Sequence, residues 1–194
     1  MGSEQYKFSR HAMYIEIEKF FSKEERIGKV IFLGESIKDH KVSKIREMFS
    51  PEAEKIVTHY PEVDMLDMPY VDNSVDFIVS DQVLEHTVNP FTAVEEAYRV
   101  LRPEGWLILC TCLMMHVHMY PNDYWRFTPE ALKILCKDFK HVDQCNAMGS
   151  YNILKECEEG NKRNKLVELD TKLEKIAMQN DNKYWTHVWI IAQK

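Results

Sequence analysis

The segment between positions 113 and 130 concentrates side chains that are able to do chemistry. His116 and His118 alternate with apolar residues, and Asp123 follows five residues later. If the chain is extended here, both imidazoles point to the same side. Three interpretations are then open. One histidine serves as a general base or orients an acceptor hydroxyl. Alternatively, both ligate a metal with Asp123, or both are ordinary loop residues. Two histidines and a distant acid are a weak metal pattern, so we predict no metal site and take His116, His118 and Asp123 as candidate catalytic residues.

Two aromatic rings and a guanidinium follow Asp123 directly. Tyr124, Trp125 and Arg126 suit an acceptor pocket, because aromatic faces stack on sugar rings and arginine binds phosphate or carboxylate. The alternative is that they pack the loop against the body of the protein. Thr128 and Pro129 then read as the cap and first residue of a helix.

Alternating strands and helices must position these residues. Apolar runs predict strands at 28–34, 54–58, 75–80, 106–112, 141–148 and 184–192, the last of them antiparallel and beside the strand at 106–112. Helical spacing predicts helices at 6–25, 41–49, 90–101, 129–139, 152–160 and 162–179. In the last of these, Leu166, Leu169, Leu173 and Ile176 are expected to face inward. This alternation predicts an α/β fold with a doubly wound, mostly parallel sheet, whose ligands lie beyond the carboxyl ends of the strands.

Composition narrows the class of protein. The chain has 194 residues, 45% hydrophobic and 29% charged, which suits one domain with a substantial core. A net charge of −6 disfavours nucleic acid as the main partner. No apolar run reaches the length of a membrane span, and the first residues do not form a signal peptide. Five cysteines without a C-x-x-C pair indicate a reducing cytoplasm. The oligomeric state has no signature in the sequence.

Several blocks together resemble one known family. They are Asp64-Met-Leu-Asp-Met-Pro-Tyr70, Asp72-Asn-Ser-Val-Asp76, Leu84-Glu85-His86, Arg99-Val-Leu-Arg-Pro-Glu-Gly105 and Pro121-Asn-Asp-Tyr-Trp-Arg-Phe-Thr-Pro129. In this order they are similar to the small-molecule branch of the class I S-adenosylmethionine-dependent methyltransferases. The last block resembles a subset often associated with surface-glycan genes. The resemblance covers roughly residues 56–139 and implies a Rossmann-like sheet of about seven strands with an antiparallel C-terminal strand.

The resemblance also implies site residues. Asp64 would accept the adenine amino group with Met65 beside it, and Gly34, Glu35 and Ser36 would face the methionine part of the cofactor. Ser80, Asp81 and Gln82 would hold its amino-acid end, and His86 would lie near the acceptor. Asp64 has an equally available role as a turn residue that binds its own backbone.

Two parts of the family pattern are altered. Phe32 stands at the usual acidic position of the first strand, and Ser36 and Lys38 replace the later glycines of the loop. Thr58, His59 and Tyr60 stand where an acid usually binds the ribose, and Glu62 is the nearest carboxylate.

We therefore expect a single domain over residues 1–194, with 1–27 as a helical lid or packing segment in which Tyr6, Arg10, His11 and Tyr14 are candidate lid residues. The expected activity is methyl transfer from S-adenosylmethionine to a hydroxyl or amine of a small acceptor, with a sugar or surface-glycan precursor as candidate. The alternative is a methyltransferase-like binding or regulatory protein that no longer methylates. Nucleic-acid modification is disfavoured by the charge and by the lack of an N-P-P-Y-type loop.

Overall fold

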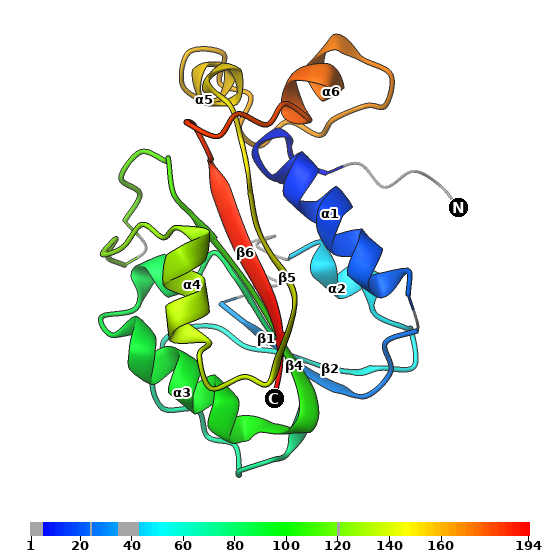
Figure 1. The fold of residues 1–194 in the computed structure, drawn as a ribbon, viewed down its shortest axis with the longest axis vertical. Coiled ribbons are helices and arrows are strands. Elements are labelled where there is room, and N and C mark those ends of the chain that lie inside the picture. The colour runs from blue at the N-terminus through cyan, green and yellow to red at the C-terminus, as the bar shows by residue number, and fades with distance from the viewer. Residues whose placement is uncertain (1–5, 24, 35–42, 120) are drawn as a thin grey trace.

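A six-stranded sheet runs through the computed structural model, which describes residues 6–23, 25–34, 43–119 and 121–194 (Figure 1). The spatial order is β2-β1-β3-β4-β6-β5. The strands are β1 (Lys29–Leu33), β2 (Glu54–Val57), β3 (Val75–Asp81), β4 (Leu101–Cys112), β5 (His141–Met148) and β6 (His187–Gln193). Neighbours among the first four are parallel, and β6 runs antiparallel to β4 and β5. The predicted doubly wound α/β sheet, with its last strand inserted beside the strand at 106–112, is confirmed.

Helices cover both faces of this sheet. They are η1 (Phe8–Arg10), α1 (His11–Phe21), α2 (Ile45–Met48), η2 (Leu84–His86), α3 (Pro90–Val100), α4 (Pro129–Leu135), α5 (Tyr151–Glu158) and α6 (Lys172–Ala177). Figure 1 shows α3 and α4 on one side of the sheet and α1 and α2 on the other. Because successive residues of a strand face opposite sides, Ile78 of β3 packs in the α3–α4 core while Phe77 and Val79 pack in the α1–α2 core.

Two helix starts form as their sequences predict. Asn89 accepts hydrogen bonds from the backbone of Phe91 and Thr92 at 3.1 and 3.3 Å, ahead of Pro90 in the first turn of α3. Thr128 accepts one from the backbone of Ala131 at 3.2 Å at the start of α4. Both caps satisfy amide groups that a helix start leaves without a partner.

The predicted helix over 162–179 is wrong for most of its length. Only α6 is helical there, because the preceding backbone pairs with the N-terminal segment: Phe8 donates to Lys165 O at 2.8 Å and Val167 donates to Tyr6 O at 2.9 Å. Val167 is fully buried in consequence, whereas Leu166 and Leu169 are exposed. Long-range pairing has overridden the local helical spacing.

Other boundaries also differ from expectation. The described residues hold six strands rather than seven, and between β2 and β3 the chain forms turns with one isolated bridge, Asp64 to Asp67. Helix α3 ends at Val100 and β4 starts at once, because Leu101 pairs with Val75. Phe91 in the first turn of α3 is half exposed.

The helices and the cysteines add two observations. No helix in the described ranges is long and apolar enough to cross a membrane. All five cysteines are free thiols, and four of them are buried.

Burial of His187 gives a prediction on stability. His187 is 1% exposed and burial lowers its pKa well below the ordinary value of 6.5. As pH falls below about 6.5, the unfolded chain gains a proton there that the folded chain does not, so stability decreases. The stability of wild type should therefore fall about 1 kcal/mol further than that of His187→Gln between pH 7.5 and 5.5. Urea unfolding at both pH values measures this difference, and equal losses in the two proteins would contradict it.

Candidate active site

A cavity of about 420 Å³ lies beyond the carboxyl ends of β1, β2 and β3. This is the edge at which open α/β sheets bind ligands, because strand order and helix starts leave a crevice there. The wall residues come from five segments: Leu33 and Gly34; His59 and Tyr60; Val63 to Leu66; Gln82, Val83 and His86 to Val88; and Pro121, Asn122 and Tyr124.

Gly34 lies directly after β1 and is required to be glycine. Its φ is +71°, a conformation that side chains disfavour, and a Cβ there would lie 2.4 Å from Cγ2 of Val83. The absent side chain lets the backbone form one wall of the cavity. Glu35 and Ser36, with Lys38, lie outside the described residues.

Asp64 and Met65 both line the cavity, as their predicted role requires. Asp64 Oδ1 accepts a hydrogen bond from Leu66 N at 2.9 Å, which is the turn-residue contact considered above. Met65 is 3% exposed and presents an apolar surface beside it. The two interpretations of Asp64 are therefore compatible, because the turn contact uses only one of its carboxylate oxygens.

The three polar residues at and just after the end of β3 point to different surroundings. Ser80 is fully buried, and its hydroxyl contacts Sδ of Met65 at 3.7 Å rather than the cavity. Asp81 accepts a hydrogen bond from the Tyr14 hydroxyl at 2.6 Å. Burial, with the Asp81 charge, raises the pKa of Tyr14 and keeps this phenol a donor. Gln82 lines the cavity at φ +61°, and its Nε2 is buried without a hydrogen-bond partner among the described residues.

Asp81 also brings α1 over the strand ends. Arg10 Nη1 lies 3.7 Å from Asp81 Oδ2 and 3.4 Å from the Tyr14 hydroxyl. Of the four candidate lid residues, Tyr6, His11 and Tyr14 are buried in this packing. The N-terminal segment thus lies over the sheet end, beside the cavity rather than in its wall.

The opposite wall of the cavity comes from η2 and the loop before α4. His86 lines it and its Nδ1 lies 2.5 Å from the carbonyl oxygen of Asn122. Tyr124 also lines it and is 47% exposed, so its ring is accessible from solvent. Of the four residues predicted to bind the acceptor, these two lie at the cavity.

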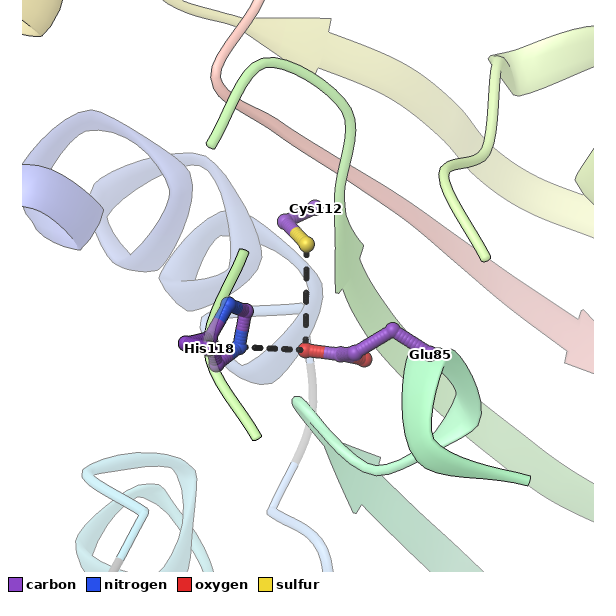
Figure 2. A group of neighbouring side chains, drawn as sticks. All are labelled: Glu85, Cys112 and His118. Carbon is purple, nitrogen blue, oxygen red and sulfur yellow. Dashed lines mark hydrogen bonds and ion pairs between the residues drawn. The ribbon is translucent and has the colours of Figure 1, made fainter. Parts of the chain in front are cut away.

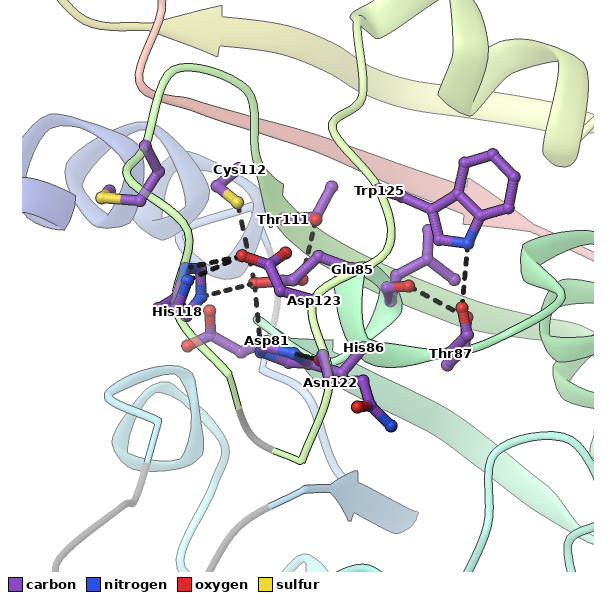
Figure 3. A network of polar contacts seen from close by, with 12 residues as sticks. Asp81, Glu85, His86, Thr87, Thr111, Cys112, His118, Asn122, Asp123 and Trp125 are labelled. Carbon is purple, nitrogen blue, oxygen red and sulfur yellow. Dashed lines mark hydrogen bonds and ion pairs between the residues drawn. The ribbon is translucent and has the colours of Figure 1, made fainter.

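Behind this wall lies a fully buried carboxylate, Glu85. Its Oε2 accepts a hydrogen bond from the Thr111 hydroxyl at 2.8 Å, and its Oε1 faces Cys112 and His118 (Figure 2). Burial acts to raise the pKa of Glu85, but His118 and Thr111 outweigh it and the pKa is lowered. Burial raises the pKa of the Cys112 thiol to about 12. Figure 3 shows the wider network, which joins η2, the end of β4 and the following loop.

His116 and His118 do not act as a pair. The chain from 113 to 119 is irregular, so the expected alternation fails and the two rings take different partners. His116 Nδ1 lies 2.7 Å from Glu158 Oε1, and its Nε2 lies 2.9 Å from Arg163 Nη1. His118 turns toward Glu85, whose charge raises the pKa of this imidazole.

Asp123, Trp125 and Arg126 hold the loop in shape. Two nitrogens of Arg126 contact the two carboxylate oxygens of Asp123, and the same guanidinium donates to the carbonyl of His116 at 3.1 Å. Arg126 lowers the pKa of Asp123, so this carboxylate is a poor proton acceptor. Trp125 Nε1 donates to Thr87 O at 2.9 Å (Figure 3). These contacts favour the packing interpretation for Trp125 and Arg126.

Several cavity residues escaped the sequence analysis. His59 and Tyr60 were noted there only as replacements for an acid, yet both line the cavity; Val83, Pro121 and Asn122 carried no chemical signal. Cys112, which lies behind the cavity wall, was predicted only as part of a strand. Its approach to Glu85 depends on parallel pairing of β3 with β4, which places the ends of the two strands together.

Comparisons with known proteins agree with this geometry. Residues 35–109 match the model of a methyltransferase domain family. A probable S-adenosylmethionine-dependent methyltransferase of Mycolicibacterium smegmatis is 40% identical over 57 residues, which are 27% of this chain and 22% of that protein. The chain matches only 8% and 22% of the length of the two curated relatives found.

Solved structures extend the likeness over most of the chain. An S-adenosylmethionine-dependent methyltransferase of Thermotoga maritima superposes with a TM-score of 0.54 at 15% identity, over 96% of this chain and 91% of that one. The 4+2 cyclase SpnF gives a TM-score of 0.54 at 13% identity, over 92% and 80%.

The sheet order and the cavity at its carboxyl edge define a protein with the class I methyltransferase fold. Within that fold, residues 35–109 are similar to the methyltransferase domain family.

The Asp123–Arg126 contact gives a prediction on the loop. Asp123→Asn removes charge-assisted hydrogen bonds of a side chain that is 1% exposed, so the free energy of unfolding should fall by about 1–3 kcal/mol. Urea unfolding measures this. Glu16→Gln, which breaks the exposed Glu16–Lys19 pair, is the control and should change little. Equal losses in the two variants would show that Asp123 has no special part in holding the loop.

Proposed function

We propose that the protein transfers the methyl group of S-adenosylmethionine to a hydroxyl or amine of a small acceptor. The observation that carries this proposal is the cavity at the strand ends, which Gly34, Asp64, Met65 and Gln82 line together. We further propose that residues 1–194 act as one domain, in which 1–27 is the N-terminal packing segment.

The cofactor would occupy the cavity along the ends of β1 and β2. Asp64 would accept a hydrogen bond from the adenine amino group, and Met65 would pack against the ring. His59 and Tyr60 would meet the ribose hydroxyls in place of the usual acid, since both line the cavity after β2. Gly34, with Glu35 and Ser36 after it in the sequence, would face the methionine part. Gln82 Nε2 is a buried donor in need of an acceptor, which suits the cofactor carboxylate.

Ser80 and Asp81 would act indirectly, through other residues. Ser80 lies behind Met65 and would support its position, and Asp81 would fix α1 through Tyr14. Their assignment to direct cofactor contact is therefore weaker than that of Gln82.

The acceptor would enter on the side of His86 and Tyr124. Methyl transfer is an in-line displacement, so alignment of donor and acceptor supplies much of the rate. An acceptor hydroxyl also needs a base. We assign that role to His86 rather than His116, His118 or Asp123, because His86 alone of these four lines the cavity. The exposed ring of Tyr124 in the cavity wall favours a sugar-like acceptor, such as a surface-glycan precursor.

The second candidate is a protein that keeps the fold without methylating. Its support is the buried Phe32 at the usual acidic position and the lack of an acid after β2. SpnF, a cyclase with a similar fold, illustrates that the fold alone does not fix the reaction.

The setting we propose is a reducing cytoplasm, consistent with five free cysteines. A small-molecule acceptor is the partner, while net charge −6 disfavours nucleic acid.

Calorimetry with S-adenosylhomocysteine tests the cofactor site. Wild type should bind with one site, and Asp64→Ala should bind about tenfold or more weakly, because a hydrogen bond to a charged group contributes about 1.5–3 kcal/mol. Asp67→Ala is the matched control, since Asp67 is an exposed acid three residues away that does not line the cavity. Equal binding by Asp64→Ala and wild type would reject the Asp64 assignment, and no binding by wild type would favour the second candidate.

A further inference from the structure

Oε1 of Glu85 is held by long contacts, in which the thiol of Cys112 is the hydrogen-bond donor. Oε1 of this fully buried carboxylate lies 3.8 Å from His118 Nε2, 3.9 Å from Cys112 Sγ and 4.0 Å from His86 Nε2. Nitrogen–oxygen hydrogen bonds are about 2.7–3.2 Å long, so neither histidine is within hydrogen-bonding distance. A buried anionic oxygen in such surroundings carries a large desolvation cost unless a positive charge compensates it.

The hydrogen bonding of His118 fixes which ring nitrogen faces Glu85. Nδ1 lies 3.1 Å from the carbonyl oxygen of His116 and 3.5 Å from Asp123 Oδ2, so Nδ1 carries the proton. In the neutral ring, Nε2 then presents a lone pair toward the Glu85 carboxylate. A lone pair and an anion 3.8 Å apart repel each other, and either a proton on Nε2 or a cation bound between the two atoms removes that repulsion. An acceptor-bound Nδ1–H and a free Nε2 are the usual state of a metal-binding histidine.

We propose that Glu85, Cys112 and His118 form a binding site for a divalent transition-metal ion of the zinc type. Their ligand atoms lie within 4.8 Å of one another, and they are the one such group of three in the described ranges (Figure 2). Atoms bound to a tetrahedral zinc ion at about 2.0–2.3 Å lie about 3.3–3.8 Å apart. The distances from Glu85 Oε1 to His118 Nε2 and to Cys112 Sγ, 3.8 and 3.9 Å, therefore need to shorten only slightly for one ion to contact all three atoms.

The remaining contacts resemble the support that metal ligands require. Thr111 holds the second oxygen of Glu85, and Asp123 and the His116 carbonyl orient His118 (Figure 3). Such outer contacts fix ligand orientation and raise affinity. Three protein ligands leave a fourth position for water, the arrangement of zinc sites that keep an open position. Binding requires the Cys112 thiol to release its proton to solvent as the sulfur–metal bond forms.

The ion would fasten the wall of the cavity. Its ligands come from η2, the end of β4 and the loop after it, and the first and last of these segments supply His86 and Tyr124 to the cavity. The site is distinct from the cofactor contacts of the proposed function, so it stands whether or not the protein methylates.

Cobalt binding tests the site directly. Full-length protein is treated with a chelator, dialysed and titrated with Co²⁺, and the near-ultraviolet band of a sulfur–cobalt bond is recorded. Wild type should develop this band with one equivalent of Co²⁺ and lose it on addition of Zn²⁺. The folded state is followed by circular dichroism, and absence of the band in folded wild-type protein at saturating Co²⁺ would overturn the proposal.

Variants locate the ion. Cys112→Ser should abolish the band, and Asp123→Asn should weaken cobalt binding by about 10–100-fold. Cys157→Ser is the matched control, because Cys157 is a buried thiol in α5 outside the cluster, and it should leave the band unchanged. A band that survives in Cys112→Ser, or that disappears in Cys157→Ser, would contradict the assigned ligands. Should Cys112→Ser not fold, His118→Gln replaces it, and undiminished cobalt affinity there would equally overturn the site.

Discussion

The buried carboxylate of Glu85 is the constraint on which the active-site end of the molecule depends. Its backbone carbonyl accepts hydrogen bonds from the amides of Tyr124 and Trp125 at 2.9 and 3.3 Å, and its side chain contacts Thr111 at the end of β4. One residue therefore ties η2 to the central strand and to the loop that closes the cavity. Because a buried charge is costly without compensation, its neighbours His118 and Cys112 are placed by an electrostatic need as well as by packing.

The cavity keeps some family features and replaces others. Gly34 has a left-handed backbone conformation after β1, and Asp64 with Met65 lines the part of the cavity in which we propose that adenine binds. After β2, an imidazole and a phenol stand where a carboxylate is usual. Both can hydrogen-bond to hydroxyl groups, so the change would alter the chemistry of the proposed ribose contact without removing it. Phe32 is fully buried in the α1–α2 core and belongs to packing rather than to the cavity.

Local signals in the sequence were sufficient for the framework. Apolar runs at β1, β3 and β6, and the caps Asn89 and Thr128, act through nearest neighbours, and all were predictable. The chain from 162 to 171 was not, because pairing with Phe8 and Tyr6 decides its conformation. The same reason separates His116 from His118: each ring follows a partner far away in the chain, Glu158 for the first and Glu85 for the second. The place of Asp64 beside the cavity was predictable from its motif, whereas the approach of Cys112 to Glu85 required the register of β3 and β4.

We propose above all that the cavity at the ends of β1, β2 and β3 holds S-adenosylmethionine. A crystal structure of the protein with S-adenosylhomocysteine tests it most directly. We expect adenine against Met65 with its amino group on Asp64, the ribose beside His59 and Tyr60, and the sulfur directed toward His86. Electron density for the ligand at another place, or an unfilled cavity in crystals grown at a saturating concentration, would contradict it.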